Sequence, residues 1–171
     1  FRKYKKDNGD IRKIYEKISI HINDTHPSLC VPELMRLLMD EEELGWDEAW
    51  DITKRVISYT NHTIMAEAME RWNIHMIKEL LPRIYMIIEE INKRYIRKLS
   101  NKYGNDFDKI GTMAVISADN VNMANLSIIG SHSVNGVAKL HTEILKKEVL
   151  KNFYEDEPFK FNNKTNGIAH R

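Results

Sequence analysis

The stretch SIHINDTHPS, residues 19–28, passes directly from a strand-like segment into a polar loop. Ile20, His21 and Ile22 alternate as in a half-buried strand, and Pro27 prevents a regular strand from continuing much further. Between them, four hydrogen-bonding side chains stand in a row: Asn23, Asp24, Thr25 and His26. Such a row at a strand end suits a turn, a metal site, an acid–base pair or a sugar-binding loop. The rest of the sequence has to decide between these alternatives.

The bulk composition is that of a soluble globular domain. At 171 residues the chain is expected to form one domain with a sizeable core. Lys and Arg number 26 against 25 Asp and Glu, so the chain lacks the strong field that nucleic-acid and membrane-surface proteins need. No apolar run approaches the roughly 20 residues of a transmembrane helix. We therefore expect no nucleic-acid partner and no membrane partner.

Cysteine usage and the termini bear on the compartment and on the extent of the chain. Cys30 is the single cysteine, which rules out an internal disulfide and favours a reducing, cytoplasmic location. No signal peptide is visible. The basic cluster at residues 2–6 is expected to be a solvated end. Because the chain begins at Phe1 rather than Met, we expect it to be part of a longer polypeptide.

Three segments in the first third of the chain have the hydrophobic spacing of helices. Residues 10–18 place their isoleucines on one face, with Asp10 as a candidate N-cap. A second helix is expected from Pro32 to near Gly45, and a third is entered through Asp47. The apolar stripe of the third helix consists of Trp46, Ala49, Trp50, Thr53 and Ile57.

A longer helical stretch is expected over residues 73–102, broken at Pro82 and closed by Gly104. Helical spacing returns from Val134 onward. Three short segments are instead expected to be strands: 19–22, 113–116 and 123–129. Short strands separated by helices predict a helix-rich α/β fold with a few short strands and several long helices.

Nucleotide and metal sites are not indicated. The segment IIGSHSVNGVAKLH, residues 128–141, contains neither the P-loop spacing nor G-x-G-x-x-G. Its Gly130 and Gly136 instead allow a ligand to approach the backbone closely. The histidines form no H-E-x-x-H motif and no cluster with metal-ligand spacing, so we expect no metal. His141 falls on an apolar helical stripe, which favours a hydrogen-bonded core histidine.

A second polar island is YTNHTIMAEAMERW, residues 59–72. The residues at 61–63, Asn-His-Thr, are expected to end one helix, and Glu67 and Glu70 to lie one turn apart in the next. A helix–helix junction would account for the capping residues. It would not require Asn-His-Thr together with two acids and Trp72, so a binding role stays open.

A third island closes the chain with FNNKTNGIAHR, residues 161–171. Asp24 and Glu67, or Glu70 in place of Glu67, could also form the carboxylate pair of a glycosidase, but that pair is defined by its separation in space. All three islands are rich in Asn, Thr, Ser and His, which both donate and accept hydrogen bonds as a sugar hydroxyl requires. Together they indicate a ligand with many neutral hydroxyl groups.

Read in order, the islands resemble the α-glucan (glycogen, starch and maltodextrin) phosphorylases. The resemblance is carried by INDTHPSLCVPELMRLLMD, GWDEAWDITKRVISYTNHTIMAEAMERW, LLPRIYMIIEEINKRY, NMANLSIIGSHSVNGVAKLHTEILKK and FYEDEPFKFNNKTNGI. It covers residues 19–171 as part of the family's N-terminal domain, whereas residues 1–18 look like a poorly matching helix or linker. The Thr-Pro that usually follows TNGI is replaced here by Ala169-His170.

The resemblance implies one Rossmann-like domain of a GT-B glycosyltransferase, up to the interdomain junction. The implied reaction is phosphorolysis of terminal α-1,4-glucosidic bonds of a glucan by inorganic phosphate, which releases glucose 1-phosphate. Pyridoxal phosphate is the implied cofactor of the full-length enzyme, and a homodimer is its implied assembly. The remainder of the phosphorylase chain would be the partner of this segment.

The resemblance also implies roles for individual residues. His62 resembles the catalytic-site histidine that meets the glucosyl 6-hydroxyl and whose carbonyl faces the anomeric carbon. Asn166 resembles the asparagine that shares this hydroxyl. The remaining candidates line the pocket or the glucan acceptor subsites: Val137, His141, Asp24, His26 and Glu67. On this basis the loop after residue 22 is expected to contact glucan hydroxyls rather than a metal.

Two family motifs are missing from the sequence. Neither a GTGNMK-type segment with the Schiff-base lysine nor an RIHEYKRQ-type phosphate-binding segment occurs. The 171-residue chain alone is therefore expected to be inactive, and none of its lysines is a candidate for cofactor attachment. Two alternatives remain open, namely a non-catalytic carbohydrate-binding or regulatory module and a helical interaction module without a ligand.

Overall fold

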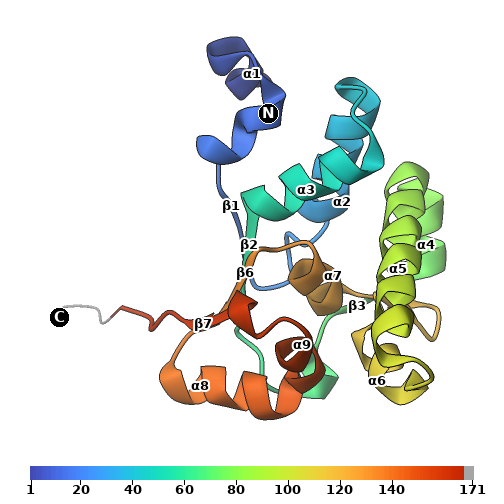
Figure 1. Cartoon of the computed structure of the whole chain (residues 1–171), viewed down its shortest axis with the longest axis vertical. Coiled ribbons are helices and arrows are strands. Elements are labelled where there is room, and N and C mark those ends of the chain that lie inside the picture. The colour runs from blue at the N-terminus through green and yellow to red at the C-terminus, as the bar shows by residue number, and fades with distance from the viewer. Residues whose placement is uncertain (168–171) are drawn as a thin grey trace.

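The computed structural model describes residues 1–167, and a parallel sheet runs through the middle of this part of the chain (Figure 1). Its strands have the order β1-β2-β6-β7. They comprise β1 Ile20–Asn23, β2 Ile57–Thr60, β6 Ser133–Gly136 and β7 Phe161–Asn163. Ile22, Tyr59 and Val134 are fully buried on these strands. Residues 168–171, including Ala169 and His170, lie outside the described part.

Helices make up most of the remaining structure and surround the sheet. The α-helices are α1 Arg2–Asn8, α2 Cys30–Arg36, α3 Trp46–Val56, α4 Ile74–Leu80, α5 Pro82–Tyr103, α6 Phe107–Met113, α7 Met123–Ile129, α8 Lys139–Ile144 and α9 Lys151–Asp156. Figure 1 shows α1 at one end of the molecule, α8 and α9 at the other, and α4 beside α5 along one flank. This arrangement confirms the predicted helix-rich α/β class.

Short irregular elements complete the chain. Short 3₁₀ helices are Ile11–Glu16, Ala66–Ala68 and Pro158–Lys160, and short π-helical segments are Leu37–Glu41 and Leu145–Val149. A small antiparallel sheet has the order β3-β5-β4, with β3 Arg71–Asn73, β4 Ile116–Ser117 and β5 Asn120–Asn122. No helix among the residues that the structure describes is both long and apolar enough to cross a membrane.

Several sequence predictions of helix boundaries are confirmed. The Asp10 side chain accepts a hydrogen bond from the backbone N–H of Arg12 at 3.0 Å and caps the turn that follows. Pro82 begins α5 after a break from α4, and Gly104 ends it with φ at 62°. A proline at the first helical position is a usual start signal, and a glycine with positive φ after the last position is a usual stop signal.

Four predictions of secondary structure were wrong. Residues 123–129 form helix α7 instead of a strand, and Ile57 begins β2 instead of ending the helix before it. Residues 134–136 belong to β6, so the helical spacing predicted from Val134 starts only at Lys139. Of the strand predicted over 113–116, only the last residue lies in β4. In α7 and β2 nearly every residue is buried, which hides the period of the element.

The polar island at 59–72 also differs from the prediction. The segment 61–63 follows strand β2 rather than a helix. Glu67 lies in the short turn Ala66–Ala68, whereas Glu70 immediately precedes β3, so the two acids do not share a helix. The helix–helix junction is therefore excluded for this segment. Its polar residues stand at the carboxyl end of a strand in a parallel sheet.

A buried carboxylate fastens α9 to α5. Lys102 Nζ and Tyr103 Oη both donate to Asp156 Oδ1, at 2.6 and 2.9 Å, and Lys98 Nζ lies 3.5 Å from Oδ2. Burial alone would raise the pKa of Asp156, but these donors hold it below its usual value. The native-state pKa is thus lower than the unfolded one, so the bonds stabilise the fold above about pH 4 and are lost at lower pH.

Asp156→Asn is expected to destabilise the fold by about 1–3 kcal/mol at pH 7, because it removes the charge that two cations and a hydroxyl share. The difference from wild type should shrink as the pH falls toward 3, where the wild-type carboxylate is also protonated. Thermal unfolding of the protein that carries this chain, followed from pH 7 to pH 3, measures the effect. A constant difference across that range would contradict the assignment.

Candidate functional site

The carboxyl ends of β1, β2, β6 and β7 meet at one edge of the parallel sheet. Backbone bonds join the loops that leave this edge: Asp24 N–H donates to Thr60 O at 3.0 Å, Asn61 N–H to Asn135 O at 2.9 Å and Asn166 N–H to Val137 O at 3.0 Å. Ligands of open α/β sheets bind in the crevice at this edge. We call the residues gathered here the carboxyl-edge site, comprising Asn23–His26, Asn61–Thr63, Gly136, Val137, His141 and Asn166.

The loop after β1 is held in a defined shape. Asp24 adopts a φ of 59°, and its carboxylate accepts from the backbone N–H of Thr25 at 2.7 Å. Thr25 Oγ1 donates to Glu70 Oε2 at 2.5 Å, and Trp72 Nε1 donates to the other oxygen of Glu70 at 2.8 Å. Thr25 is therefore a buried structural residue. Asp24 is left half-buried and His26 exposed at the site.

A second set of contacts fixes the loop after β1 from the side of α7. Ser28 Oγ donates to the carbonyl of Thr25 at 2.5 Å and lies 2.7 Å from Ser127 Oγ on α7. Both serines are fully buried. Because buried hydroxyl groups are costly to leave unpaired, this pair couples the position of α7 to the loop that carries Asp24 and His26.

His62 is exposed after the end of β2 and, within residues 1–167, makes one side-chain hydrogen bond, to Asn23 at the end of β1. Its Nε2 lies 2.7 Å from Asn23 Oδ1. An amide oxygen only accepts, so Nε2 carries a proton, and in the neutral ring Nδ1 then keeps its lone pair. The ring of His62 is thereby oriented with an acceptor nitrogen free for a hydroxyl group.

The backbone on both sides of His62 is held by the buried side chain of Asn61 and its partner Tyr59. Asn61 is fully buried, its Nδ2 donates to Tyr59 Oη at 3.0 Å, and its Oδ1 accepts from the N–H of Thr63 at 2.9 Å. Burial is the main reason that the pKa of Tyr59 is raised, so its hydroxyl stays neutral. Bonds on both sides of His62 therefore fix the direction of its peptide groups.

His141 closes the site from α8. Its Nδ1 accepts from the backbone N–H of Val137 at 3.2 Å, so its proton resides on Nε2. Burial, and next the neighbouring His62, lower the pKa of His141 and favour the neutral ring. Nε2 is buried without a hydrogen-bond partner within residues 1–167. A donor is thus available on the side of the ring that faces away from Val137.

Of the seven predicted site residues, six lie at the carboxyl-edge site: Asp24, His26, His62, Val137, His141 and Asn166. Glu67 is exposed in the turn between β2 and β3, and no hydrogen bond joins it to the other six in the described residues. Glu70, three residues further along the same island, bonds to the loop instead. The role of Glu67 therefore stays a prediction.

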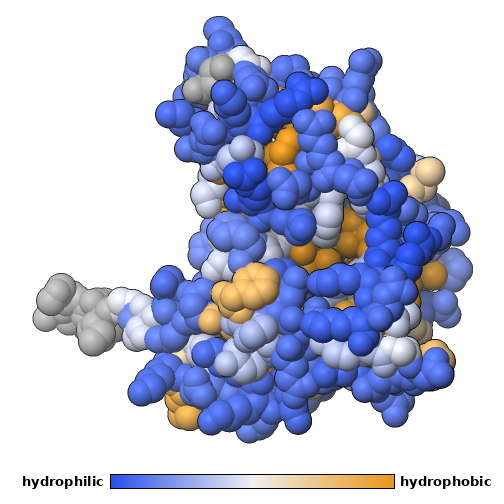
Figure 2. All heavy atoms as spheres, viewed as in Figure 1, coloured by the Kyte–Doolittle hydropathy of each residue, from blue (hydrophilic) through white to orange (hydrophobic). Residues whose placement is uncertain are grey.

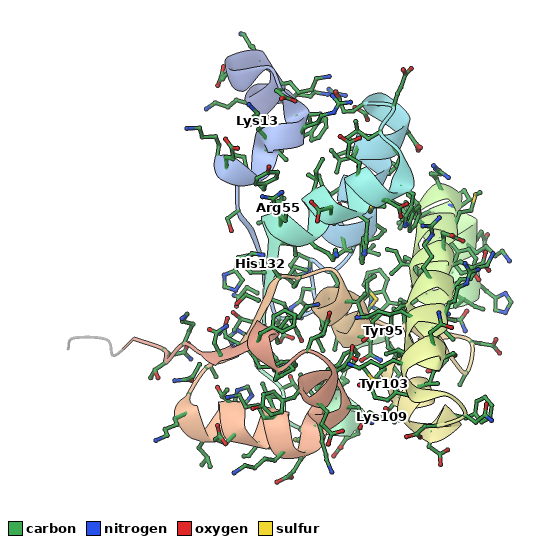
Figure 3. The ribbon with its side chains drawn as sticks, in the orientation of Figure 1. Lys13, Arg55, Tyr95, Tyr103, Lys109 and His132 are labelled. Carbon is green, nitrogen blue, oxygen red and sulfur yellow. The ribbon has the colours of Figure 1, made fainter. Side chains whose placement is uncertain are left out.

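No metal centre is found at this edge among the described residues, and His132 lies away from it. Within residues 1–167 no group of three or more His, Cys, Asp or Glu residues is placed to hold a metal ion. His132 lies at the amino end of β6 (Figure 3), where its Nδ1 donates to the carbonyl of Lys54 at 3.2 Å. The site is thus built from amides, hydroxyls and imidazoles around Asp24.

A family model described as "Carbohydrate phosphorylase" matches residues 1–171. The chain belongs to the carbohydrate phosphorylase family. Its polar carboxyl edge is therefore part of a phosphorylase, which confirms the resemblance noted in the sequence.

Two relatives illustrate the match. The chain is 56% identical over 168 residues to the glycogen phosphorylase of Bacillus subtilis (strain 168), which covers 98% of this chain and 21% of the relative. It is 52% identical over 159 residues to the muscle form of human glycogen phosphorylase, covering 91% of this chain and 19% of the relative. The chain thus spans about a fifth of the length of these curated relatives.

Two contributors to the carboxyl-edge site were not assigned from the sequence. Asn23 was noted only as part of a polar row, although it orients His62, and Glu70 was considered only as an alternative to Glu67. The sequence did carry a signal for Asn23, because Asn23 is the last residue of β1 and His62 closely follows the last residue of β2. That signal could be used only with the knowledge that β1 pairs with β2, in the register Ile20↔Ile57 through Asn23↔Thr60.

Proposed function

We propose that this chain forms the glucosyl-binding wall of an α-glucan phosphorylase. The reaction is phosphorolysis of a terminal α-1,4-glucosidic bond by inorganic phosphate, with release of glucose 1-phosphate. The observation that carries the proposal is the convergence of Asn23, His62, Val137 and Asn166 at one edge of the sheet in a member of this family. The same edge offers donors and acceptors to neutral hydroxyls.

His62 is assigned the central role. Its free Nδ1 accepts from the glucosyl 6-hydroxyl, and Asn166 shares that hydroxyl as a donor. The carbonyl of His62 faces the anomeric carbon, where a preorganised dipole stabilises positive charge that develops in the transition state. Asp24, His26 and Glu67 are assigned to the glucan acceptor subsites, and Val137 and His141 to the wall of the glucosyl pocket.

Pyridoxal phosphate is proposed for the full-length enzyme, but the residues described do not fit its attachment. Lys160 is the deeply buried lysine among them, and it pairs with Glu157 rather than pointing to the carboxyl-edge site. Lys164, next to the site, is exposed. We therefore place the cofactor lysine and the phosphate-binding residues outside this chain, and derive no step through the cofactor.

The partners of the chain follow from the same proposal. Edge strands β1 and β7 each pair on one side only within the described sheet, and an unpaired edge calls for further structure. We propose that the remainder of the phosphorylase polypeptide completes this domain, that the enzyme is a cytoplasmic homodimer, and that the 171-residue chain alone has no phosphorolytic activity.

The full-length protein that contains this chain tests the proposal. It is incubated with maltoheptaose, inorganic phosphate and pyridoxal phosphate, and glucose 1-phosphate is measured. Release that saturates with maltoheptaose and requires phosphate supports the proposal. A folded, cofactor-loaded protein that binds maltoheptaose without releasing glucose 1-phosphate would instead favour a carbohydrate-binding module.

Asn23→Leu is expected to reduce kcat about tenfold, because His62 loses the acceptor that fixes its proton on Nε2. The decisive measurement is a double-mutant cycle in the full-length protein. Once His62→Ala has been introduced, Asn23→Leu should have no further effect on kcat. Independent, additive losses would show that Asn23 acts in some other way than through His62.

A further inference from the structure

The two faces of the parallel sheet differ in chemistry. Ile22, Tyr59 and Val134 point into the hydrophobic core. Figure 1 shows α3, α5 and α7 to one side of the strands, and Figure 2 shows apolar side chains in the hollow between these helices. Successive residues of a strand point to opposite faces, so the other face carries polar side chains from three strands: His21, Asn23, Thr60 and Asn135. Of these, the proposed function uses only Asn23.

The remaining three side chains form a chain of hydrogen bonds across β1, β2 and β6. His21 Nε2 lies 2.5 Å from Thr60 Oγ1, and Thr60 Oγ1 donates to Asn135 Oδ1 at 2.8 Å. Asn135 Nδ2 in turn donates to the carbonyl of Gly136 at 3.1 Å. Thr60 stands in the middle of this chain and is 5% exposed, whereas His21 is exposed at its outer end. The chain therefore ends on a backbone atom of the carboxyl-edge site.

The positions of the protons follow from the last member of the chain. A carbonyl oxygen only accepts, so Asn135 turns its Nδ2 toward Gly136 and its Oδ1 toward Thr60. The single proton of the Thr60 hydroxyl is then used on Oδ1, so Thr60 accepts from His21, whose Nε2 carries a proton. All three bonds thus point in one direction, and the side chain at position 60 must both accept and donate.

The inner part of the chain borders His62. The carbonyl of Asn135 accepts from the N–H of Asn61 at 2.9 Å, and His62 is the next residue. The ring of His62 bonds to Asn23, which is the direct neighbour of Thr60 in the register of the sheet. The chain therefore lies next to both the backbone and the ring partner of His62.

The end of the chain holds the segment that carries Asn166. The carbonyl of Gly136, which accepts from Asn135, also accepts from the N–H of Lys164 at 3.1 Å. Asn166 follows Lys164 by two residues. One set of hydrogen bonds thus connects the two residues that are assigned to the glucosyl 6-hydroxyl, His62 and Asn166.

We propose that Thr60 is a positioning residue of the carboxyl-edge site, which places His62 and Asn166 relative to each other through this hydrogen-bond chain. The inference rests on the proposed function, in which these two side chains bind one glucosyl ring. Without the hydroxyl of Thr60, the proton of His21 and the Oδ1 atom of Asn135 lose their partner. The amide of Asn135 is then free to turn, and its bond to the backbone at the end of β6 is no longer fixed.

Calorimetric titration of the full-length protein with D-glucose, beside phosphorolysis of maltoheptaose, tests this role. Thr60→Val replaces the hydroxyl with a methyl group of similar size. It is expected to weaken glucose binding about threefold to tenfold and to lower kcat/KM about tenfold, at a temperature where the variant is folded, because small displacements of positioned groups are costly. Thr60→Ser keeps both the donor and the acceptor and should restore both values to within about twofold of wild type.

Thr53→Val is the matched control. Thr53 is also fully buried, on α3, but its Oγ1 has no hydrogen-bond partner within residues 1–167. The same substitution there should leave glucose affinity and kcat/KM unchanged. A second pair of variants acts at the exposed end of the chain: His21→Leu removes the donor and should weaken glucose binding about threefold, whereas His21→Gln keeps a donor and should bind as wild type does. This pair decides the question if Thr60→Val does not fold.

Glucose binding is measured without turnover, so the two proposals can fail separately. A wild-type protein that binds glucose but releases no glucose 1-phosphate would overturn the proposed reaction, and the affinities of the variants would still decide the role of Thr60. Equal glucose affinity of wild type and Thr60→Val, a loss that Thr60→Ser does not restore, or a folded wild-type protein that does not bind glucose would overturn the positioning role.

Discussion

His62→Ala in the full-length protein is expected to reduce kcat for glucose 1-phosphate release by about a hundredfold or more, with little change in stability. The side chain is exposed, and its one side-chain hydrogen bond is to Asn23, so its removal leaves no cavity and no buried polar group unpaired. In the proposed function, its loss removes an oriented acceptor next to the reacting sugar. Oriented groups of this kind are worth about 3–4 kcal/mol in the transition state.

The measurement compares wild type and His62→Ala with maltoheptaose and phosphate under saturating conditions, beside a thermal unfolding curve for each. His75→Ala provides a matched control, because His75 is an exposed histidine on α4, outside the carboxyl-edge site. Equal losses in both kcat and kcat/KM would assign the His62 contact to the transition state. An active His62→Ala enzyme would remove His62 from the catalytic role, while leaving the family assignment intact.

The polar islands were predictable as a candidate binding site, since the residue types alone suit a sugar ligand. Their convergence was not, because it depends on a parallel sheet whose strands β1, β2 and β6 are each four residues long. In β2 the burial of successive residues hardly alternates, because three of the four are buried. The strand also follows α3 directly, so its first residue continues the apolar stripe of that helix. Buried parallel strands lack the alternation by which strands are recognised.

Helix α7 illustrates the same limit in the opposite direction. Six of its seven residues are buried, including Ser127, so MANLSII shows neither a helical stripe nor a strand alternation. Its identity as a helix follows from tertiary structure, in which Ser127 bonds back to the carbonyl of Met123 at 2.9 Å and meets Ser28 across the core. By contrast, α5 has one clear buried stripe and was predicted almost to the residue.

Gly136→Ala is expected to damage both stability and activity, because there is no room for a Cβ atom at the end of β6. That atom would lie 2.6 Å from Thr142 Oγ1, 2.7 Å from His141 Nδ1 and 3.0 Å from Thr142 Cα. Relief requires α8 to move away from the strand, since a backbone atom is among the three. Overpacking of this kind costs about 1–3 kcal/mol.

The loss of activity should exceed what the loss of stability explains. Any displacement of His141 breaks its 3.2 Å bond to the N–H of Val137 and frees the segment that Asn166 joins through the carbonyl of Val137. We expect kcat/KM for maltoheptaose to fall at least about tenfold at a temperature where the variant is still folded. Gly111→Ala is the matched control, because nothing lies within 4 Å of its Cβ position in α6 and alanine favours the helix by about 1 kcal/mol. If Gly136→Ala were as active as Gly111→Ala, the close packing of α8 on β6 would have no part in shaping the glucosyl pocket.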